Sequence, residues 1–216
     1  MWYIITKNGG QATKETREKL LQTATELFAR RGIDGVSTRD LAKVSGVNLC
    51  SINYYFGSKQ NLYDAVLECV IEKISNFASS KQIPLQTQNL TPIEEFDAFA
   101  SNMVDFLCSD KISGAGAELL IKEIIQPTNV YNKLYQTVIE PMHKRMTAIV
   151  MKITGLDEHN AIIQTHCLMG QVVMFKVHKS ALLRRLDVKD YSPELITKIK
   201  SRIIENCHIL LKGVTK

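Results

Sequence analysis

The stretch that decides the fold is STRDLAKVSGVNLCSINYYFGSK, residues 37–59. Ser37, followed three residues later by an aspartate, is typical of a capping box, in which two side chains bond the free backbone amides at the start of a helix. Gly46 then predicts a sharp end to that helix, because glycine enters the left-handed conformation easily. Asn48 is a predicted cap for the next short helix, expected over residues 48–56. The stretch therefore predicts two short helices joined by a tight turn.

This arrangement suits DNA. Two short helices joined by a glycine turn can place the second helix in a major groove while the first crosses the phosphate backbone. Within the second helix, Ile52 and Phe56 lie four residues apart and are expected to pack inward together. The side chains left facing outward are Leu49, Cys50, Asn53 and Tyr54. A buried helix would not carry this many polar groups without partners. The alternative is a helical hairpin held together by aromatic packing.

Positive charge gathers in the same part of the chain. The 216 residues carry a formal net charge of +5. Residues 1–59 hold nine basic and five acidic residues, a net of +4, and the remainder is close to neutral at +1. A small basic module favours a polyanionic partner such as nucleic acid, although a solvated basic surface is the alternative.

Helical periodicity continues along the rest of the chain, without an alternating strand pattern or an internal repeat. A polar, proline-punctuated connector is expected at residues 79–92, a glycine loop at residues 113–116, and a kink at Pro141. The later helices are expected over residues 59–77, 92–109, 113–126, 128–154, 157–178 and 192–212. We therefore expect an all-α protein with a three-helix helix-turn-helix domain at residues 14–58. A flexible tail at residues 1–13 precedes it, and a larger helical domain at residues 59–216 follows.

Several classes of protein are excluded by missing patterns. No apolar run is long enough for a membrane span, and the amino end lacks the features of a secretory signal, so a cytoplasmic protein is expected. The chain contains no phosphate-binding loop, no G-x-S-x-G and no H-E-x-x-H, so neither catalysis nor a cofactor is expected. The five scattered cysteines form no C-x-x-C and fit a reducing compartment.

Histidine and cysteine also occur side by side on the last two long helices, as His166-Cys167 and Cys207-His208. Imidazole and thiolate pairs can hold zinc, but adjacent residues on a helix point in different directions. Packing is therefore the expected role, and no metal site is predicted. His143 stands alone in the sequence. A redox role for Cys50, which is expected to face DNA, is left open beside a simple apolar contact.

At the helix-turn-helix positions the sequence resembles the TetR family of transcriptional regulators, over about residues 14–77. The matching residues are Thr16-Arg17-Glu18-Lys19-Leu20-Leu21, Ala24, Leu27-Phe28-Ala29, Arg31-Gly32, Ser37-Thr38-Arg39-Asp40-Leu41-Ala42, Gly46-Val47 and Tyr54-Tyr55-Phe56-Gly57-Ser58-Lys59. Family members commonly show Tyr-Tyr-His-Phe where this chain has Asn53-Tyr54-Tyr55-Phe56. The resemblance implies a domain whose second short helix reads DNA.

The rest of the chain resembles the CecR-like carboxy-terminal domain of one TetR subgroup. The matching residues are Glu118-Leu119-Leu120, Lys122-Glu123, Gln126-Pro127, Ile139-Glu140-Pro141, Leu168-Met169-Gly170-Gln171 and Leu183-Arg184-Arg185-Leu186. This resemblance implies an all-α domain at residues 59–216 for ligand sensing and dimerisation.

The chemistry of these residues divides the predicted DNA contacts into phosphate contacts and base contacts. Ser37 and Thr38 lie at a helix amino end, where hydroxyl and amide donors suit a phosphate. The resemblance implies that Lys59 and Tyr54 also contact phosphates. Arg39 suits the O6/N7 edge of guanine, with a surface ion pair as the alternative. Asn53 suits adenine, and Leu49 suits the methyl group of thymine. The full predicted set is Ser37, Thr38, Arg39, Asn48, Leu49, Cys50, Ser51, Asn53, Tyr54, Tyr55 and Lys59.

Aromatic and methionine side chains on the middle helices suit an apolar or amphipathic effector, although a filled core is an equal alternative. The predicted effector-binding residues are Phe77, Phe99, Met103, Phe106, Tyr131, Tyr135, Met142 and Met146. Pairing of the last two long helices with their twins would form a homodimer of two-fold symmetry. The predicted interface residues are Ile162, His166, Met169, Gly170, Val173, Ile199, Ile203 and Leu210.

These features predict a homodimeric regulator that binds a palindromic DNA operator and acts as a repressor, released by a small effector. The resemblance implies that the effector shifts the helix at residues 59–77 and changes the separation of the two reading helices. The alternative is a helical protein-interaction or metal- and redox-sensing module that does not bind DNA. The sequence does not identify the operator, the effector or the regulated genes.

Overall fold

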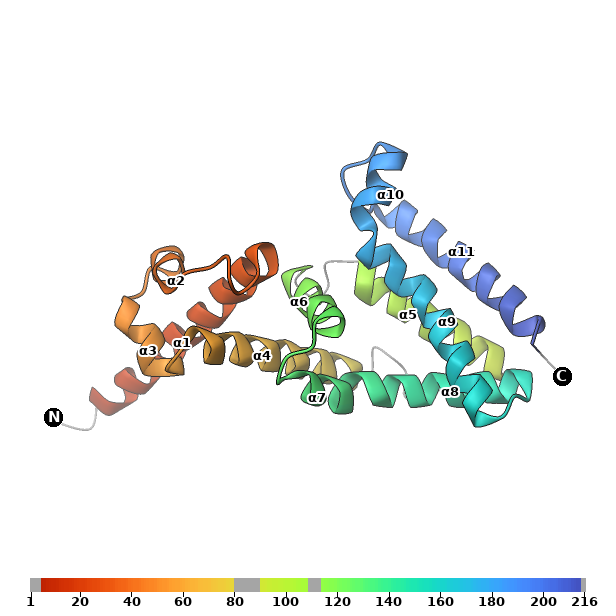
Figure 1. The fold of residues 1–216 in the computed structure, drawn as a ribbon, viewed down its shortest axis with the longest axis horizontal. Helices are drawn as coiled ribbons and strands as arrows, with labels where there is room; N and C mark the ends of the chain where they lie inside the picture. Colours follow the sequence, from red (N-terminus) through yellow and green to blue (C-terminus); the bar gives the residue numbers. More distant parts are fainter. Residues whose placement is uncertain (1–4, 80–89, 109–113, 215–216) are drawn as a thin grey trace. The chain divides into compact units, whose positions relative to one another are not determined.

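The protein is all-α, as expected from its sequence. The computed structural model describes residues 5–79, 90–108 and 114–214, except for the side chains of residues 5–12 and 77–79. Every regular element in these ranges is a helix (Figure 1). The helices are α1 (Ile5–Arg31), α2 (Thr38–Ser45), α3 (Leu49–Phe56), α4 (Lys59–Ser79), α5 (Pro92–Cys108), α6 (Gly114–Ile125), α7 (Tyr131–Leu134), a π-helical turn (Tyr135–Ile139), α8 (Glu140–Thr154), α9 (Glu158–Val177), α10 (Lys179–Leu186) and α11 (Pro193–Lys212).

The chain forms two compact units. The first contains Met1–Lys73 and Ala115–Lys133, and the second contains Ile74–Gly114 and Leu134–Lys216. The first unit is therefore discontinuous in sequence, because α6 belongs with α1 to α4. The predicted functional boundaries at 13/14 and 58/59 stay predictions, since compactness does not test them.

In the first unit, α1 to α4 bury one apolar side each. The fully buried large side chains are Leu20 and Phe28 from α1, Leu41 from α2, Ile52 from α3, and Leu62, Leu67 and Ile71 from α4. Phe28 meets the ring of Tyr63 edge-on, with the ring centroids 5.4 Å apart. Burial of each such side chain contributes about 1.5–3 kcal/mol to stability, so this small core holds the two short helices in place.

Polar contacts attach α6 and α7 to the same unit. The Lys122 ammonium donates to the carbonyl oxygen of Ala29 at 2.5 Å, in the last turn of α1, where helix carbonyls lack partners. Lys133 forms an ion pair of 3.2 Å with Glu68 of α4. The buried carboxylate of Glu123 accepts from the backbone N–H of Thr128 at 2.8 Å, and so fixes the turn after α6. These contacts explain why a segment distant in sequence joins the first unit.

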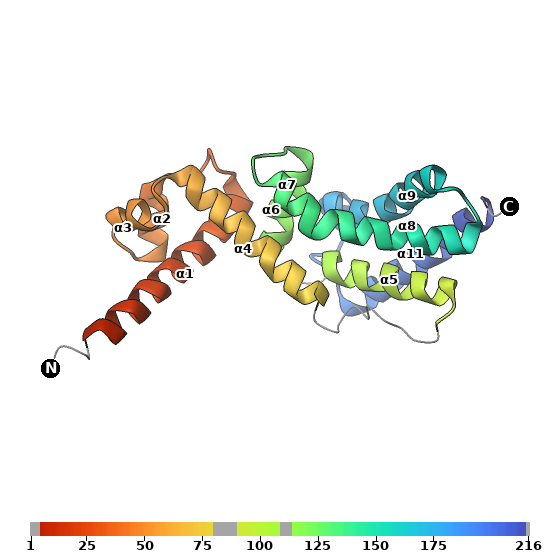
Figure 2. The same ribbon diagram turned by 90° about the horizontal axis from the view of Figure 1, so that it is seen from below.

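The second unit is built around α5, α8, α9 and α11, which pack against one another (Figures 1 and 2). Its core is formed by apolar side chains from all four helices. The members buried most deeply are Phe96 and Val104 from α5, Ile149 and Val150 from α8, Ala161 and Leu168 from α9, and Ile203, Cys207 and Leu211 from α11.

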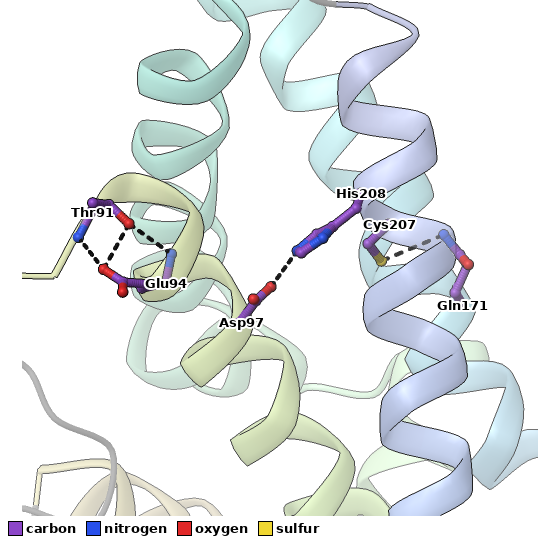
Figure 3. A network of polar contacts seen from close by, with 6 residues as sticks. All are labelled: Thr91, Glu94, Asp97, Gln171, Cys207 and His208. Carbon is purple, nitrogen blue, oxygen red and sulfur yellow. Dashed lines mark hydrogen bonds and ion pairs between the residues drawn. The ribbon is translucent and has the colours of Figure 1, made fainter.

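Side-chain contacts connect these helices across the edges of the core. His208 of α11 lies 2.6 Å from the carboxylate of Asp97 on α5, and the amide of Gln171 on α9 contacts the sulfur of Cys207 at 3.7 Å (Figure 3). Figure 3 also shows Thr91 and Glu94, which form a capping box at the start of α5. Burial raises the pKa of the Cys207 thiol to about 11, so this sulfur is not a ready nucleophile or metal ligand at neutral pH.

One predicted helix is interrupted. The expected single helix at residues 128–154, kinked at Pro141, is instead α7, a π-helical turn and α8. The backbone N–H of Glu140 bonds the carbonyl oxygen of Tyr135, five residues back. Proline has no N–H and its ring clashes with the preceding turn, so the wider π turn just before Pro141 accommodates it.

Other boundaries also differ from the expected ones. α1 begins at Ile5, inside the predicted tail, and α6 begins at Gly114, inside the predicted glycine loop. α10 was not predicted, because it is two turns long and buries none of its residues. The expected connector at residues 79–92 lies mostly outside the described residues.

Candidate nucleic-acid interface

The amino end of α2 is held by the predicted capping box. The Ser37 hydroxyl accepts from the backbone N–H of Asp40 at 3.0 Å, and the Asp40 carboxylate accepts from the Ser37 backbone N–H at 3.0 Å and from its hydroxyl at 2.6 Å. The bond from the Ser37 hydroxyl, and then the bond from the Ser37 backbone N–H, hold the pKa of the Asp40 carboxyl below its usual value. The Ser37 hydroxyl is thus engaged within the cap, which leaves Thr38 and the free amides of the first turn as the better-placed donors for a phosphate.

The turn between α2 and α3 depends on Gly46. Its backbone has φ of 67° in the left-handed region, and its N–H bonds the carbonyl oxygen of Ala42. Asn48 then caps α3, because its side-chain oxygen accepts from the backbone N–H of Cys50 at 2.9 Å. Both features were predicted. Asn48 is therefore a structural cap first, with its amide NH₂ left to face outward.

Helix α3 presents one face to the core and the other to solvent. Ile52 and Phe56 are buried, as predicted. The exposed residues are Leu49, Cys50, Asn53 and Tyr54, with Ser51 and Tyr55 half-buried beside them. Tyr54 is 78% exposed and meets the ring of Tyr55 edge-on at 5.0 Å, which restricts where its hydroxyl can lie. The outward face carries no charged side chain, so its chemistry suits base edges.

Arg39 supplies a cation on α2, the helix that precedes α3. It is exposed and makes no ion pair within the part of the chain that the structure describes, so the alternative of a surface pair is not formed there. Arg17 of α1 was not predicted as a contact. Its guanidinium lies 5.4 Å from the centre of the Phe56 ring, at the carboxyl end of α3. Arg17 is a single arginine in a helix whose sequence is dominated by an apolar stripe. The sequence therefore does not indicate that Arg17 contacts Phe56.

Lys59 is placed differently from the simple phosphate clamp that the resemblance implies. Its ammonium donates to the carbonyl oxygens of Ile33 and Val36, at 2.8 and 3.1 Å. An ammonium has three donors, so one remains for a phosphate. These carbonyl partners could not be predicted from the sequence, because they lie in an irregular loop between α1 and α2.

The predicted effector-binding residues differ in burial and in the unit to which they belong. Phe99, Met103 and Met146 are buried in the core of the second unit, as in the filled-core alternative. Phe106 and Met142 pack against that core and are partly buried. The remaining predicted residues are Tyr131, in the first unit, Tyr135, exposed on the π turn, and Phe77, whose side chain lies outside the described residues.

Three of the predicted dimer residues point into the core of the chain instead of toward a partner. Met169, Ile199 and Ile203 are buried in the chain's own core, so they cannot form its surface. Met169 lies on α9, which has apolar residues on both sides, and Ile199 and Ile203 belong to the buried apolar stripe of α11. Periodicity does not show whether such residues pack within the chain or against a second copy. Exposed or half-buried members are Ile162, His166, Gly170, Val173 and Leu210. Further exposed apolar residues of α9 and α11 are Ile163, Met174, Val177 and Ile209.

The two histidine–cysteine pairs do not form a metal site. Cys207 is buried against Gln171 and His208 pairs with Asp97, whereas His166 and Cys167 are exposed on α9. No group of three or more potential metal ligands occurs among the described residues. Within the same ranges, no helix combines the length and apolar character needed to cross a membrane.

Comparison with known proteins agrees with this architecture. Residues 92–214 match the family described as the C-terminal domain of the HTH-type transcriptional dual regulator CecR, and residues 20–66 match the bacterial regulatory proteins of the tetR family. The HTH-type transcriptional dual regulator CecR of Shigella flexneri is 27% identical over 221 residues, which cover 98% of this chain and 96% of that protein.

Solved structures share the fold. A transcriptional regulator from Rhodococcus sp. Rha1 matches with a TM-score of 0.63 at 15% identity, over 93% of this chain and 98% of that one. A protein from Saccharomonospora viridis, assigned as a transcriptional regulator and solved in complex with choline, matches with a TM-score of 0.62 at 14% identity, over 90% of this chain and 96% of that one. The chain belongs to the TetR family of transcriptional regulators, in the group that carries a CecR-type C-terminal domain.

Proposed function

We propose that this regulator binds a palindromic operator as a homodimer, represses transcription there, and is released by a small apolar or amphipathic effector. The observation that carries the proposal is the outward face of α3. Its exposed side chains are uncharged, its amino end is capped by Asn48, and the Arg17 guanidinium lies against Phe56 at its carboxyl end. Such a helix is shaped to enter a major groove in a cytoplasmic complex with chromosomal DNA.

Within this proposal the contacts divide by chemistry. Asn53 and Leu49 read base edges, and Arg39 reaches a guanine. Thr38, Tyr54 and the remaining donor of Lys59 bind phosphates, which position the helix without reading sequence. Lys59→Ala is expected to weaken binding to all operator variants about equally and to reduce the slope of affinity against salt by roughly one unit.

Dimerisation is supported by the outer face of α9. From Ala161 to Phe175 this helix contains no charged residue, and it exposes Ile162, Ile163 and Met174. Apolar side chains exposed on a stretch without charged residues favour a second partner besides the helix's own core. Two copies paired along α9 and α11 would present two α3 helices, and reading two half-sites requires these to lie about 34–36 Å apart.

The effector response is supported by the place of α6. This helix belongs to the first unit, where Lys122 bonds the end of α1 and the following α7 pairs with α4 through Lys133. An effector that displaced α6 would therefore act on the DNA-reading unit directly. It must bind the released state more tightly than the DNA-bound state to have any effect. The choline complex of one structural neighbour supports a small molecule as the effector.

The decisive experiment selects bound duplexes from a random pool with the full chain. The proposal expects a palindrome whose half-site centres lie one helical turn apart, bound with a steep salt dependence. Transcription from a template that carries the selected site should fall when the protein is added. Binding without a preferred sequence would contradict the proposed operator, and increased transcription would contradict repression.

A further inference from the structure

Two imidazole rings from different helices lie side by side on the second unit. His143 of α8 and His166 of α9 have ring centroids 6.2 Å apart, with the ring planes tilted by 34°. His166 is exposed and His143 is half-buried. The sequence presents His143 as a single histidine, and only the packing of α8 against α9 pairs it with His166.

A hydroxyl network fixes the ring of His143. The buried hydroxyl of Thr147 donates to the hydroxyl oxygen of Thr165 at 3.2 Å, so its own oxygen is free to accept. That oxygen lies 3.4 Å from Nδ1 of His143. The proton of the neutral ring is thereby assigned to Nδ1, which leaves a lone pair on Nε2. Metal-binding histidines are typically oriented in this way, by a hydrogen bond from the nitrogen that does not bind the metal.

The nitrogens that remain are available. Nε2 of His143 and both ring nitrogens of His166 have no hydrogen-bond partner among the residues that the structure describes. Neutral imidazole is the form that binds metal ions.

The spacing suits one ion held between the two rings. With metal–nitrogen distances of about 2.0–2.1 Å, two imidazoles on one ion have ring centres roughly 5–6 Å apart. The observed 6.2 Å exceeds this slightly. Because the His166 side chain is exposed, a small rotation about its χ angles closes the difference while His143 stays fixed by Thr147.

We propose that His143 and His166 form a two-imidazole site for a late divalent transition-metal ion. Imidazole ligands suit nickel, copper and zinc, and the site lacks the carboxylates that would favour magnesium or calcium. No third protein ligand lies with this pair in the described part of the chain. Water fills the remaining positions, so the ion is bound reversibly and bridges α8 to α9.

Nickel(II) is the probe, and the full chain is used without a histidine tag. Cys50→Ser and Cys167→Ser are introduced as the common background, because both thiols are exposed and bind soft metals themselves. Isothermal titration should show one nickel ion per chain. His166→Gln should weaken nickel binding by about tenfold or more, because even the outer partners of metal ligands typically account for 10–100-fold.

Matched controls separate the site from other histidines. His159→Gln changes an exposed histidine on the same helix and should leave nickel affinity unchanged. Thr147→Val keeps the shape of the side chain but removes the bond that orients His143, and should weaken binding less than His166→Gln does. His166 is exposed, so its replacement leaves the fold intact, which circular dichroism verifies. Absence of nickel binding to the background chain, or equal affinity in His166→Gln and His159→Gln, would overturn the proposal.

Discussion

Helices α3 and α9 differ in the residues that lie opposite their buried side. Each buries one apolar side in the core of its unit. On α3 the opposite side carries short polar groups such as Asn53 and Ser51, so the sequence itself separates core from contact surface. On α9 the opposite side carries apolar residues, such as Ile163 at 53% exposed, beside polar ones such as His166. Periodicity therefore predicted the outward residues of α3 correctly and mixed the two faces of α9.

The largest expected effect tests the outer face of α9. Ile163→Glu places a charge where the proposed partner helix would cover it, and an unpaired buried charge costs about 3–5 kcal/mol. We expect the dimer to dissociate in light scattering at micromolar concentration and operator binding to be lost with it. Ile125→Glu, at an exposed isoleucine of α6 in the first unit, should stay dimeric. An Ile163→Glu protein that remained dimeric would place the interface elsewhere.

The inner face of α9 is expected to affect the stability of the monomer instead of the dimer. Leu168 is buried in the core, so Leu168→Ala leaves a cavity and should lower the free energy of unfolding by about 2–5 kcal/mol in urea. Ile163→Ala should change the stability of the monomer by no more than about 0.5 kcal/mol, since surface substitutions rarely do more. If the two variants were equally destabilised as monomers, the assignment of inner and outer faces would be wrong.

On α3 the corresponding test concerns sequence preference. Asn53→Ala is expected to cost about 1–3 kcal/mol of operator affinity and to relax the preference at one base pair. Competition binding against operators changed one base pair at a time measures both effects. Tyr54→Phe serves as the control, because loss of a phosphate contact weakens all operators alike. Uniform weakening by Asn53→Ala would show that this residue does not read a base.

The smallest effect concerns the cap of α2. Ser37→Ala should lower stability by about 1 kcal/mol, the usual contribution of an N-cap. The Asp40 pKa is lowered in the folded protein, so its contribution is fully present above the unfolded pKa near 3.8 and is lost as pH falls through the folded value. Melting curves between pH 7 and acid should therefore converge for wild type and Asp40→Asn. A difference in melting temperature between the two proteins that persists in acid would contradict this linkage.

The sequence predicted the parts of the site that depend on neighbours along the chain. The capping box at Ser37, the left-handed Gly46 and the cap at Asn48 each involve residues within a few positions of one another, and all were correct. The carbonyl partners of Lys59 and the pairing of His143 with His166 depend on how separate segments pack. Local patterns carry no information about such contacts.

The discontinuity of the first unit has a consequence for synthesis of the protein. Its amino-terminal helices emerge from the ribosome first, but α6 and its bonds to α1 follow only after α5 has been made. Because domains fold as units, the helix-turn-helix unit is not complete until α5 and α6 have been made. A truncated chain that ended before Ala115 would lack Lys122 and Glu123. The fold therefore links the completion of the helix-turn-helix unit to the synthesis of a segment more than forty residues further along the chain.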